Sequence, residues 1–393
     1  MTRGEKSVSV VMPCLNEAES IAGCVTDARA ALAEAGLEGE VIVVDNGSVD
    51  ESAALAERAG ARVVPEPRRG YGSAYLAGFA AARGDYIVMA DADGSYPLGD
   101  VARFVERLEA GADFVIGSRL KGQIEPGAMP RLHRWVGNPA LTGVLNLLFR
   151  SGVSDAHCGM RAIRRDLLSR LDLRTTGMEL ASEQVIRASK AGATIAELPI
   201  TYRRRAGRSK LSSFSDGWRH LRFLLVHSPT WLFMVPGCLF LAVGAGVGFL
   251  VALEVELFGH PWQLHALIAA AVLSIVGAQV LSMGLVARTY AAYYLGEEDP
   301  LFRRLRPRIQ LEHGLVAGAV LAIAGAVMLA VVLGTWIERG FGALREEKLA
   351  VGGLTLLVLG IQTVFAAFLL SILGLRRRVH GAEEPEPELL LPE

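Results

Sequence analysis

The sequence lacks an excess of charge of either sign. It holds 40 Lys and Arg residues against 41 Asp and Glu residues, for a formal net charge of −1. A nucleic-acid binder would carry a basic excess, so this balance argues against that class of protein. Cysteine is scarce as well, with four residues and no Cys-x-x-Cys spacing. The pattern predicts neither a disulfide framework nor a zinc site, and we expect a reduced, cytosolic setting.

Two phosphate-binding motifs are also missing. No GxGxxG follows the first apolar run, which ends in PCLNE, and no Gly-rich loop ends in Lys-Ser or Lys-Thr. The sequence therefore predicts neither a dinucleotide fingerprint nor a P-loop. Residues 69–72 (RGYG) leave two interpretations open, a loop that approaches phosphate at a helix N-terminus or a flexible turn. The polar start MTRGEKS has no apolar h-region, so we expect no cleaved signal peptide.

Long uncharged apolar runs are what the second half of the chain has in abundance. Each of four runs has at least 23 residues, and they cover residues 231–253, 264–286, 315–337 and 349–375. At about 1.5 Å rise per residue, a helix of that length exceeds a hydrocarbon core of about 30 Å. The alternative is that the four runs are buried helices of a soluble protein. Soluble cores rarely contain four uncharged runs of this length in succession. Asp, Glu, Lys and Arg are absent from the runs, which argues against a proton-coupled transporter.

The basic residues around these runs predict their orientation. Arginines and lysines precede the first run and fill the connection at residues 288–314, whereas the connection at residues 254–263 contains two Glu and no Lys or Arg. The positive-inside rule then places the N-terminal domain and both termini in the cytoplasm, with two small outward loops. We expect a multi-pass protein of the plasma membrane.

Short runs rich in Val and Ile alternate with helical stretches up to about residue 228. The expected strands are residues 7–12, 40–44, 62–64, 85–89 and 113–116, and the expected helices are residues 17–35, 50–59, 72–82 and 98–109. Strands that alternate with helices of this size predict an α/β domain with a mostly parallel, Rossmann-like sheet covered on both faces. In such sheets, ligands collect beyond the carboxyl ends of the strands.

Acidic residues gather at these expected strand ends. Asp45 follows the second strand, and Asp91 and Asp93 follow the fourth. A turn there lets the two carboxylates of Asp91 and Asp93 converge on one point. Two carboxylate oxygens that leave the other coordination positions free suit Mg²⁺ or Mn²⁺. Such an ion takes its other ligands from water and a substrate diphosphate. A solvated turn is the alternative for a bare Asp-x-Asp pair, but its place after a strand of a βα sheet favours the metal.

The combination of these segments resembles the family 2 (GT-A fold) glycosyltransferases, and more narrowly the polyprenyl-phosphate glycosyltransferases such as dolichyl-phosphate mannose synthase. The matching segments run in the family's order through residues 7–228: VSVVMPCLNE, VIVVDNGSVD, GYGSAYLAGF, YIVMADADGS, GSR, VSDAHCGMRAIRRD, GMELASE and ELPITYRRRAGRSKL. The family's usual DADL reads DADG here, a minor departure. The resemblance implies a GT-A catalytic domain, and the four apolar runs resemble the membrane half of some members.

The resemblance also implies roles for individual residues. Carried over by position, it assigns catalysis to Asp93, Asp155 and Arg119, metal binding to Asp91 and Asp93, nucleotide binding to Pro13, Asn16, Glu17, Asp45 and Asp91, sugar binding to Glu183, and phosphate or acceptor binding to Arg131, Arg134, Arg161, Arg204, Ser209 and Lys210. One further family arginine corresponds to either Arg131 or Arg134, because this segment fits the pattern loosely. Asp155 is interpreted as an orienting group rather than as an obligate base.

The reaction that the resemblance implies is transfer of a hexose, glucose or mannose first, from a UDP- or GDP-linked sugar to a polyprenyl or dolichyl phosphate. A phosphate monoester has a second pKa near ~6 and is largely dianionic at neutral pH, so a strong general base is unnecessary. The site instead needs cations that hold two phosphate groups close together. Mg²⁺ or Mn²⁺ would stabilise the negative charge that develops on the departing nucleoside diphosphate. Direct displacement would invert the anomeric configuration.

The chain is expected to have four parts: a cytosolic glycosyltransferase domain at residues 1–212, an interfacial amphipathic helix at 213–228, a four-helix transmembrane domain at 229–376 and a disordered tail at 377–393. Apolar residues at a spacing of three to four in residues 214–226 indicate a helix at the membrane surface, or else an ordinary packing helix. We interpret Arg203, Arg205 and Arg208 as anchors for anionic head groups, and reserve phosphate binding for Arg204 and Lys210.

The sequence leaves two other functions open. A processive polysaccharide synthase of the same superfamily normally carries a Q-x-x-R-W motif, but the nearest string, RLHRW at residues 131–135, lacks the Gln. A flippase or scaffold for lipid-linked sugars would have no use for the paired aspartates. The expected partners are a nucleotide-sugar, a polyprenyl-phosphate lipid and the membrane, with no nucleic acid, and a homo-oligomer stays open.

Overall fold

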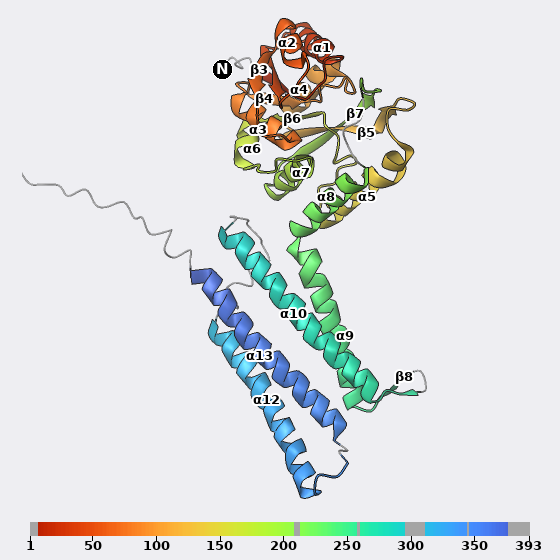
Figure 1. Cartoon of the computed structure of the whole chain (residues 1–393), viewed down its shortest axis with the longest axis vertical. Coiled ribbons are helices and arrows are strands. Elements are labelled where there is room, and N and C mark those ends of the chain that lie inside the picture. Colours follow the sequence, from red (N-terminus) through yellow and green to blue (C-terminus); the bar gives the residue numbers. More distant parts are fainter. Residues whose placement is uncertain (1–6, 208–212, 258–259, 295–310, 344–345, 376–393) are drawn as a thin grey trace, which may run out of the picture. The chain divides into compact units, whose positions relative to one another are not determined.

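The computed structural model describes residues 7–207, 213–257, 260–294, 311–343 and 346–375. The chain divides into two compact units, Met1–His227 and Ser228–Glu393. The first unit contains a sheet with helices around it, and the second consists mainly of long helices (Figure 1).

A seven-stranded sheet forms the centre of the first unit, in the order β3-β2-β1-β4-β6-β5-β7. Its strands are β1 (Val8–Cys14), β2 (Gly39–Asp45), β3 (Arg62–Pro65), β4 (Tyr86–Met89), β5 (Phe114–Ile124), β6 (Arg161–Arg164) and β7 (Ile195–Tyr202). All neighbours pair in parallel except β6, which runs antiparallel to both β4 and β5. The predicted mostly parallel α/β fold is confirmed. The reversed strand β6 and the last strand β7 are additions that local sequence patterns did not predict.

Helices pack around this sheet and bury its apolar strands. They are α1 (Ile21–Glu34), α2 (Ser52–Arg58), α3 (Tyr71–Ala81), α4 (Val101–Glu109), α5 (Asn138–Phe149), α6 (Arg165–Arg170), α7 (Leu180–Lys190) and α8 (Ser213–Val226). All four residues of β4 are buried, as are nearly all residues of β1. A parallel sheet that is covered on both faces requires such continuous apolar strands, which is why the sequence shows runs of Val and Ile.

The last helix of the first unit, α8, is attached by a buried polar cluster. The Ser182 hydroxyl on α7 lies 3.1 Å from His220 Nδ1 on α8 and 3.3 Å from His157 Nε2. The two imidazole rings meet edge to face at 4.7 Å. Burial, followed by the neighbouring His220, lowers the pKa of His157 to about 3, so this histidine is neutral at physiological pH. The helix also packs against α5.

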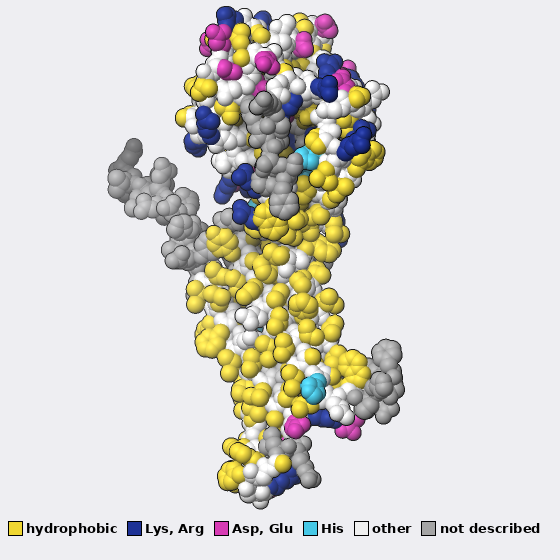
Figure 2. All heavy atoms as spheres, turned by 45° about the vertical axis from the view of Figure 1, so that its right-hand side comes forward, with side chains coloured by type: hydrophobic (Ala, Val, Ile, Leu, Met, Phe, Trp, Pro, Cys, Tyr) yellow, Lys and Arg dark blue, Asp and Glu magenta, His cyan; other side chains and the backbone are white. Residues whose placement is uncertain are grey.

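Within its described residues, the second unit contains four helices that are long and apolar enough to cross a membrane, over Thr230–Ala252, Leu264–Ala292, Leu311–Glu338 and Glu347–Gly374. They include the π-helical turn Thr230–Met234 with α9 (Val235–Ala252), then α10 (Leu264–Tyr294), α12 (Leu311–Glu338) and α13 (Glu347–Leu375), and a short hairpin of β8 (Glu256–Leu257) and β9 (His260–Pro261) follows α9. Figure 2 shows hydrophobic side chains covering the visible face of these helices. The predicted four-span helical region is confirmed.

Glycine allows these helices to approach closely. A Cβ added at Gly244 on α9 would lie 2.6 Å from the backbone nitrogen of Ser274 on α10, and one at Gly360 on α13 would lie 2.4 Å from that of Ala322 on α12. Larger residues would force each pair apart, because small residues are what let membrane helices pack backbone to backbone. The predicted tail at residues 377–393 lies outside the described part of the chain.

Candidate active site

A pocket of about 230 Å³ opens at the carboxyl ends of the central strands of the first unit. Four of the predicted site residues line it: Pro13 near the end of β1, Glu17 in the loop after that strand, and Asp91 and Asp93 after β4. The start of α3 supplies another wall through residues 69–71. The pocket therefore lies where ligands of open α/β sheets bind.

The two aspartates of the Asp-x-Asp pair are held differently. Asp93 is buried, and its Oδ1 accepts hydrogen bonds from the backbone nitrogen of Ser95 at 3.0 Å and from its hydroxyl at 2.5 Å. Asp91 Oδ1 accepts a hydrogen bond of 3.0 Å from the Tyr71 hydroxyl. Burial and then the charge of Asp91 raise the pKa of Tyr71 well above 10, so its hydroxyl stays protonated and donates.

The pair fits a hard divalent cation. Burial, and then the negative charge of Asp93, raise the pKa of Asp91 to about 7, and a divalent cation bound beside the two carboxylates would favour their charged forms. Within the described ranges, no group of three or more His, Cys, Asp or Glu side chains is placed to hold a metal. A Mg²⁺ or Mn²⁺ ion held by Asp91 and Asp93 would have room for ligands from water and a substrate diphosphate.

Arg205 supplies a cation to this pocket that sequence reasoning did not place there. Its Nη2 lies 3.2 Å from Asp93 Oδ2 and 3.8 Å from Glu17 Oε1, and its side chain lines the pocket. The interpretation of Arg205 as a membrane anchor is therefore wrong. The loop after β7 is tied to the aspartate turn, because Arg203 N donates to Ser95 O and Ala206 N donates to Asp93 O. No local signal distinguishes Arg205 from its two neighbouring arginines.

Arg204 points elsewhere. It is exposed, its backbone nitrogen donates to Glu125 Oε2 at 3.2 Å, and its guanidinium lies beside Gly127. Ser209 and Lys210, the other members of the predicted phosphate-binding set, lie outside the described residues. The assignment of these three residues to phosphate or acceptor binding stays a prediction.

The predicted nucleotide-binding segments are joined to each other by hydrogen bonds. Asn16 Oδ1 accepts from Val49 N at 2.8 Å, and Asp45 Oδ1 accepts from Ser48 N at 3.0 Å, so the ends of β1 and β2 form one rim. Asn46, which was not singled out for a role, lines the pocket itself. Its side-chain nitrogen donates to two carbonyls and its Oδ1 accepts from Gly70 N at 2.7 Å. This one amide therefore fixes the loop that leads into α3.

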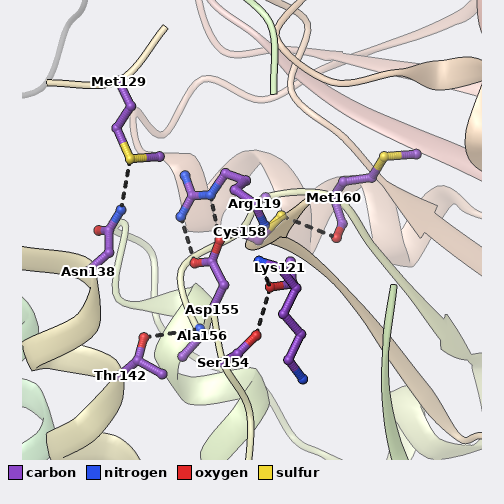
Figure 3. Close-up of polar contacts among 12 residues, drawn as sticks. Arg119, Lys121, Met129, Asn138, Thr142, Ser154, Asp155, Ala156, Cys158 and Met160 are labelled. Carbon is purple, nitrogen blue, oxygen red and sulfur yellow. Dashed lines mark hydrogen bonds and ion pairs between the residues drawn. The ribbon is translucent and has the colours of Figure 1, made fainter. Parts of the chain in front are cut away.

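Arg119 and Asp155 form a buried ion pair (Figure 3). Arg119 Nε lies 2.7 Å from Asp155 Oδ2, and Nη2 lies 2.8 Å from Oδ1, so the pair is bidentate. Burial alone would raise the pKa of Asp155, but the Arg119 charge outweighs it and holds that pKa below its usual range. Neither side chain lines the pocket. The structure brings these two predicted residues together, and their catalytic roles stay predictions.

Arg161 is held within the protein. Its side chain is 1% exposed and donates to the carbonyl oxygens of Cys158, Ala181 and Ala156 at 2.6–2.7 Å, and to Gln184 Oε1 at 2.9 Å. These contacts join β6, the loop before it and α7. To contact the acceptor as predicted, Arg161 would have to give up some of these hydrogen bonds in favour of bonds to the acceptor.

Glu183, predicted to bind sugar, is buried on α7 and organises a neighbouring loop. Its carboxylate accepts from the backbone nitrogens of Arg174 and Thr175 at 2.9–3.1 Å, and from Arg187 Nε at 2.9 Å. The same loop contacts the start of α3, because Ser73 N donates to Thr176 O at 3.1 Å. Glu183 thus supports the wall of the pocket that Met178 lines.

Arg131 and Arg134 lie away from the pocket, before and within the π-helical turn His133–Gly137. The Arg134 guanidinium stacks over the Trp135 ring at 5.1 Å, and Trp135 is 71% exposed. The choice between the two arginines as a phosphate ligand stays a prediction.

Comparison with known proteins agrees with this architecture. Residues 9–172 match Glycosyl transferase family 2, and residues 285–374 match the Glycosyltransferase family 2 C-terminal transmembrane region. The low-salt glycan biosynthesis hexosyltransferase Agl6 of Haloferax volcanii is 40% identical over 369 residues, covering 94% of this chain and 89% of that protein. A dolichyl-phosphate hexose transferase of the same organism is 37% identical over 216 residues, covering 53% of this chain and 89% of that protein.

A solved structure is also similar to part of this chain. Glucosyl-3-phosphoglycerate synthase from Mycobacterium tuberculosis, in complex with Mn²⁺ and UDP-glucose, has a TM-score of 0.45 at 27% identity, covering 57% of this chain and 79% of that chain.

The fold and the site define a membrane-bound enzyme with a GT-A-like catalytic unit. The chain belongs to glycosyltransferase family 2. The predictions of family, enzyme class and fold are confirmed.

Proposed function

We propose that this enzyme transfers a hexose from a UDP- or GDP-linked sugar to the phosphate of a polyprenyl or dolichyl lipid. The observation that carries the proposal is the pocket lined by Asp91, Asp93 and Arg205, in a chain whose second unit has four helices able to cross a membrane. Two relatives support it, since one is named a hexosyltransferase and the other a dolichyl-phosphate hexose transferase.

The residues of the pocket would act mainly by charge and position. When bound by Asp91 and Asp93, Mg²⁺ or Mn²⁺ supplies positive charge that offsets the charge developing on a departing nucleoside diphosphate. Arg205 and Arg69, which both line the pocket, add positive charge to it. A dianionic lipid phosphate needs no strong base to attack the anomeric carbon, and its direct attack would invert the configuration. Asp155, bound to Arg119, then serves to orient that arginine.

The membrane-facing part of the first unit is proposed to be the surface of α8 together with residues 132–149, which contain a turn and the helix α5. Both carry exposed apolar side chains, which are Leu132, Trp135, Val136, Leu147, Trp218 and Val226. Tryptophan beside arginine is typical of surfaces that lie at the level of lipid head groups. Such a surface would bring the lipid phosphate toward the catalytic unit.

We propose that the catalytic unit and both termini face the cytoplasm, in the plasma membrane. The prediction is that, in intact cells, a membrane-impermeant thiol reagent leaves a single cysteine placed at Asp50 unlabelled and labels one placed at Glu338. The physical reason is the positive-inside rule. The arginine-rich connection at residues 288–314 is expected to stay in the cytoplasm, on the same side of the membrane as the catalytic unit. The variants would be made in a chain from which the four native cysteines have been removed. Labelling of the Asp50 position before lysis would contradict this orientation.

The proposed function is tested by incubating membranes that contain the enzyme with a panel of radiolabelled UDP- and GDP-hexoses, followed by lipid extraction. One hexose on a lipid phosphate supports the proposal. A long polymer would identify a processive synthase instead, and an absence of label from lipid with every donor would reject sugar transfer to lipid.

Two adjacent arginines offer a matched prediction. Replacing Arg205 with Ala should raise the KM for the nucleotide-sugar by about 10–100-fold, because a charge-assisted hydrogen bond contributes about 1.5–3 kcal/mol. Replacing Arg204 with Ala should leave the donor KM within about threefold, since its side chain is outside the pocket. Steady-state kinetics with varied donor measure both values. Equal donor KM values for the two variants would remove Arg205 from the donor site.

A further inference from the structure

Tyr71 is the first residue of α3 and lines the pocket beside the aspartate pair. Among the described residues, its hydroxyl is the group that hydrogen-bonds the Asp91 carboxylate, at 3.0 Å from Oδ1. The other oxygen, Oδ2, faces Gly159, where an added Cβ would lie only 2.9 Å away. Asp91 is thus enclosed between the Tyr71 hydroxyl and the backbone of Gly159.

The position of the Tyr71 hydroxyl is itself fixed by its surroundings. Its ring packs edge to face on Tyr75, with centroids 4.9 Å apart. The preceding residue, Gly70, has a φ of 146°, a conformation that L side chains rarely adopt, and its nitrogen is bound by Asn46 Oδ1. An added Cβ at Gly70 would also lie 2.3 Å from Thr176 O. The loop before α3 therefore has little freedom to carry Tyr71 away from Asp91.

The two aspartates differ in how much support they receive. Asp93 is held by the backbone and hydroxyl of Ser95 within its own turn and is also contacted by Arg205, whereas the hydrogen bond to Asp91 comes from Tyr71, a residue of another element. Outer groups that hydrogen-bond a ligating carboxylate fix its orientation, and their loss typically lowers metal affinity by about 10–100-fold. Removing the Tyr71 hydroxyl would leave Asp91 free to rotate within its side of the pocket.

We propose that Tyr71 is a positioning residue that holds Asp91 in the orientation needed to bind the divalent cation. The inference rests on the proposed function, in that it takes Asp91 and Asp93 to be the metal ligands. It assigns a role to the RGYG segment that the sequence left open between a phosphate-binding loop and a flexible turn.

The test compares Tyr71→Phe with Tyr75→Phe in the full-length enzyme in detergent. Tyr75 lies one turn further along α3, and among the described residues the hydrogen bond to the Asp91 carboxylate comes from Tyr71 and not from the buried Tyr75 hydroxyl. Mn²⁺ binding is measured by electron paramagnetic resonance in the presence of saturating UDP, and separately of GDP. We expect Tyr71→Phe to weaken Mn²⁺ binding by about 10–100-fold and Tyr75→Phe to change it by less than about threefold.

A second readout separates positioning from general damage to the fold. If Tyr71 acts through Asp91, saturating Mn²⁺ should restore most of the turnover of Tyr71→Phe, whereas a partly unfolded protein would not recover. Equal Mn²⁺ affinities for Tyr71→Phe and the wild type, in a wild type that binds the ion, would overturn this proposal alone. A wild type that binds no Mn²⁺ with either nucleotide would overturn the metal assignment as well.

Discussion

Replacing Asp93 with Asn should lower sugar transfer to polyprenyl phosphate by at least about 1,000-fold, which corresponds to about 4 kcal/mol of transition-state stabilisation. The substitution keeps an oxygen that can accept the two hydrogen bonds from Ser95, so the turn after β4 should stay intact. It removes the charge that would hold a divalent cation and that Arg205 contacts. Transfer is measured with radiolabelled donor in membranes, beside wild type at equal expression.

Thermal unfolding of the purified Asp93→Asn variant provides the control. Its midpoint should lie within a few degrees of the wild-type value, because the side-chain volume and the hydrogen bonds are kept. Undiminished transfer by this variant would contradict the metal assignment, and a large fall in the midpoint would mean that Asp93 supports the fold rather than the chemistry.

Replacing Asp155 with Ala should destabilise the first unit by about 3–5 kcal/mol, because it leaves the Arg119 guanidinium buried without its counter-charge. For a unit of this size, that corresponds to a fall of about 10 °C in the unfolding midpoint. Glu51→Ala is the matched control, since the Glu51–Arg58 pair is exposed on both sides and such pairs contribute at most about 1 kcal/mol. Calorimetry or fluorescence-detected unfolding of the full chain measures the difference.

A double replacement separates the structural and catalytic roles of this pair. Arg119→Met combined with Asp155→Leu removes both charges and keeps an apolar volume, so most of the lost stability should return. Transfer should remain abolished if Arg119 acts on the donor or the acceptor, as the family resemblance implies. Recovery of full transfer by the double variant would show that the pair serves the fold alone.

The same ion pair gives a pH dependence of stability. The pKa of Asp155 is lower in the folded protein than its ordinary value of about 3.9, so the contribution of the pair is fully present above that value. It is lost as the pH falls through the lower folded pKa. The first unit should therefore keep this contribution from pH 7 down to about pH 4, and Asp155→Asn should lack the loss that the wild type shows below it.

The aspartate pair and Arg205 differ in whether local sequence predicts their place in the site. The aspartate pair was predictable because a buried apolar strand, Tyr86–Met89, ends immediately before it, and covalent adjacency fixes where the carboxylates lie. Arg205 was not predictable, because three arginines in succession follow β7 and only the hydrogen bonds to the aspartate turn decide which one enters the pocket. The choice depends on a contact between segments that are far apart in the chain.

Local sequence patterns are enough to predict the alternation of strands and helices up to residue 116, the four apolar spans and the acidic end of β4, since each of these follows from the periodicity or length of a single local segment. Tertiary structure alone decided that β6 runs antiparallel, that Arg119 is paired with Asp155, that Glu183 supports a loop and that Tyr71 contacts Asp91. These features depend on which side chains meet through space. Most of these contacts join residues that are far apart in the chain and that meet only after the sheet has formed. A local sequence pattern therefore does not identify the partner.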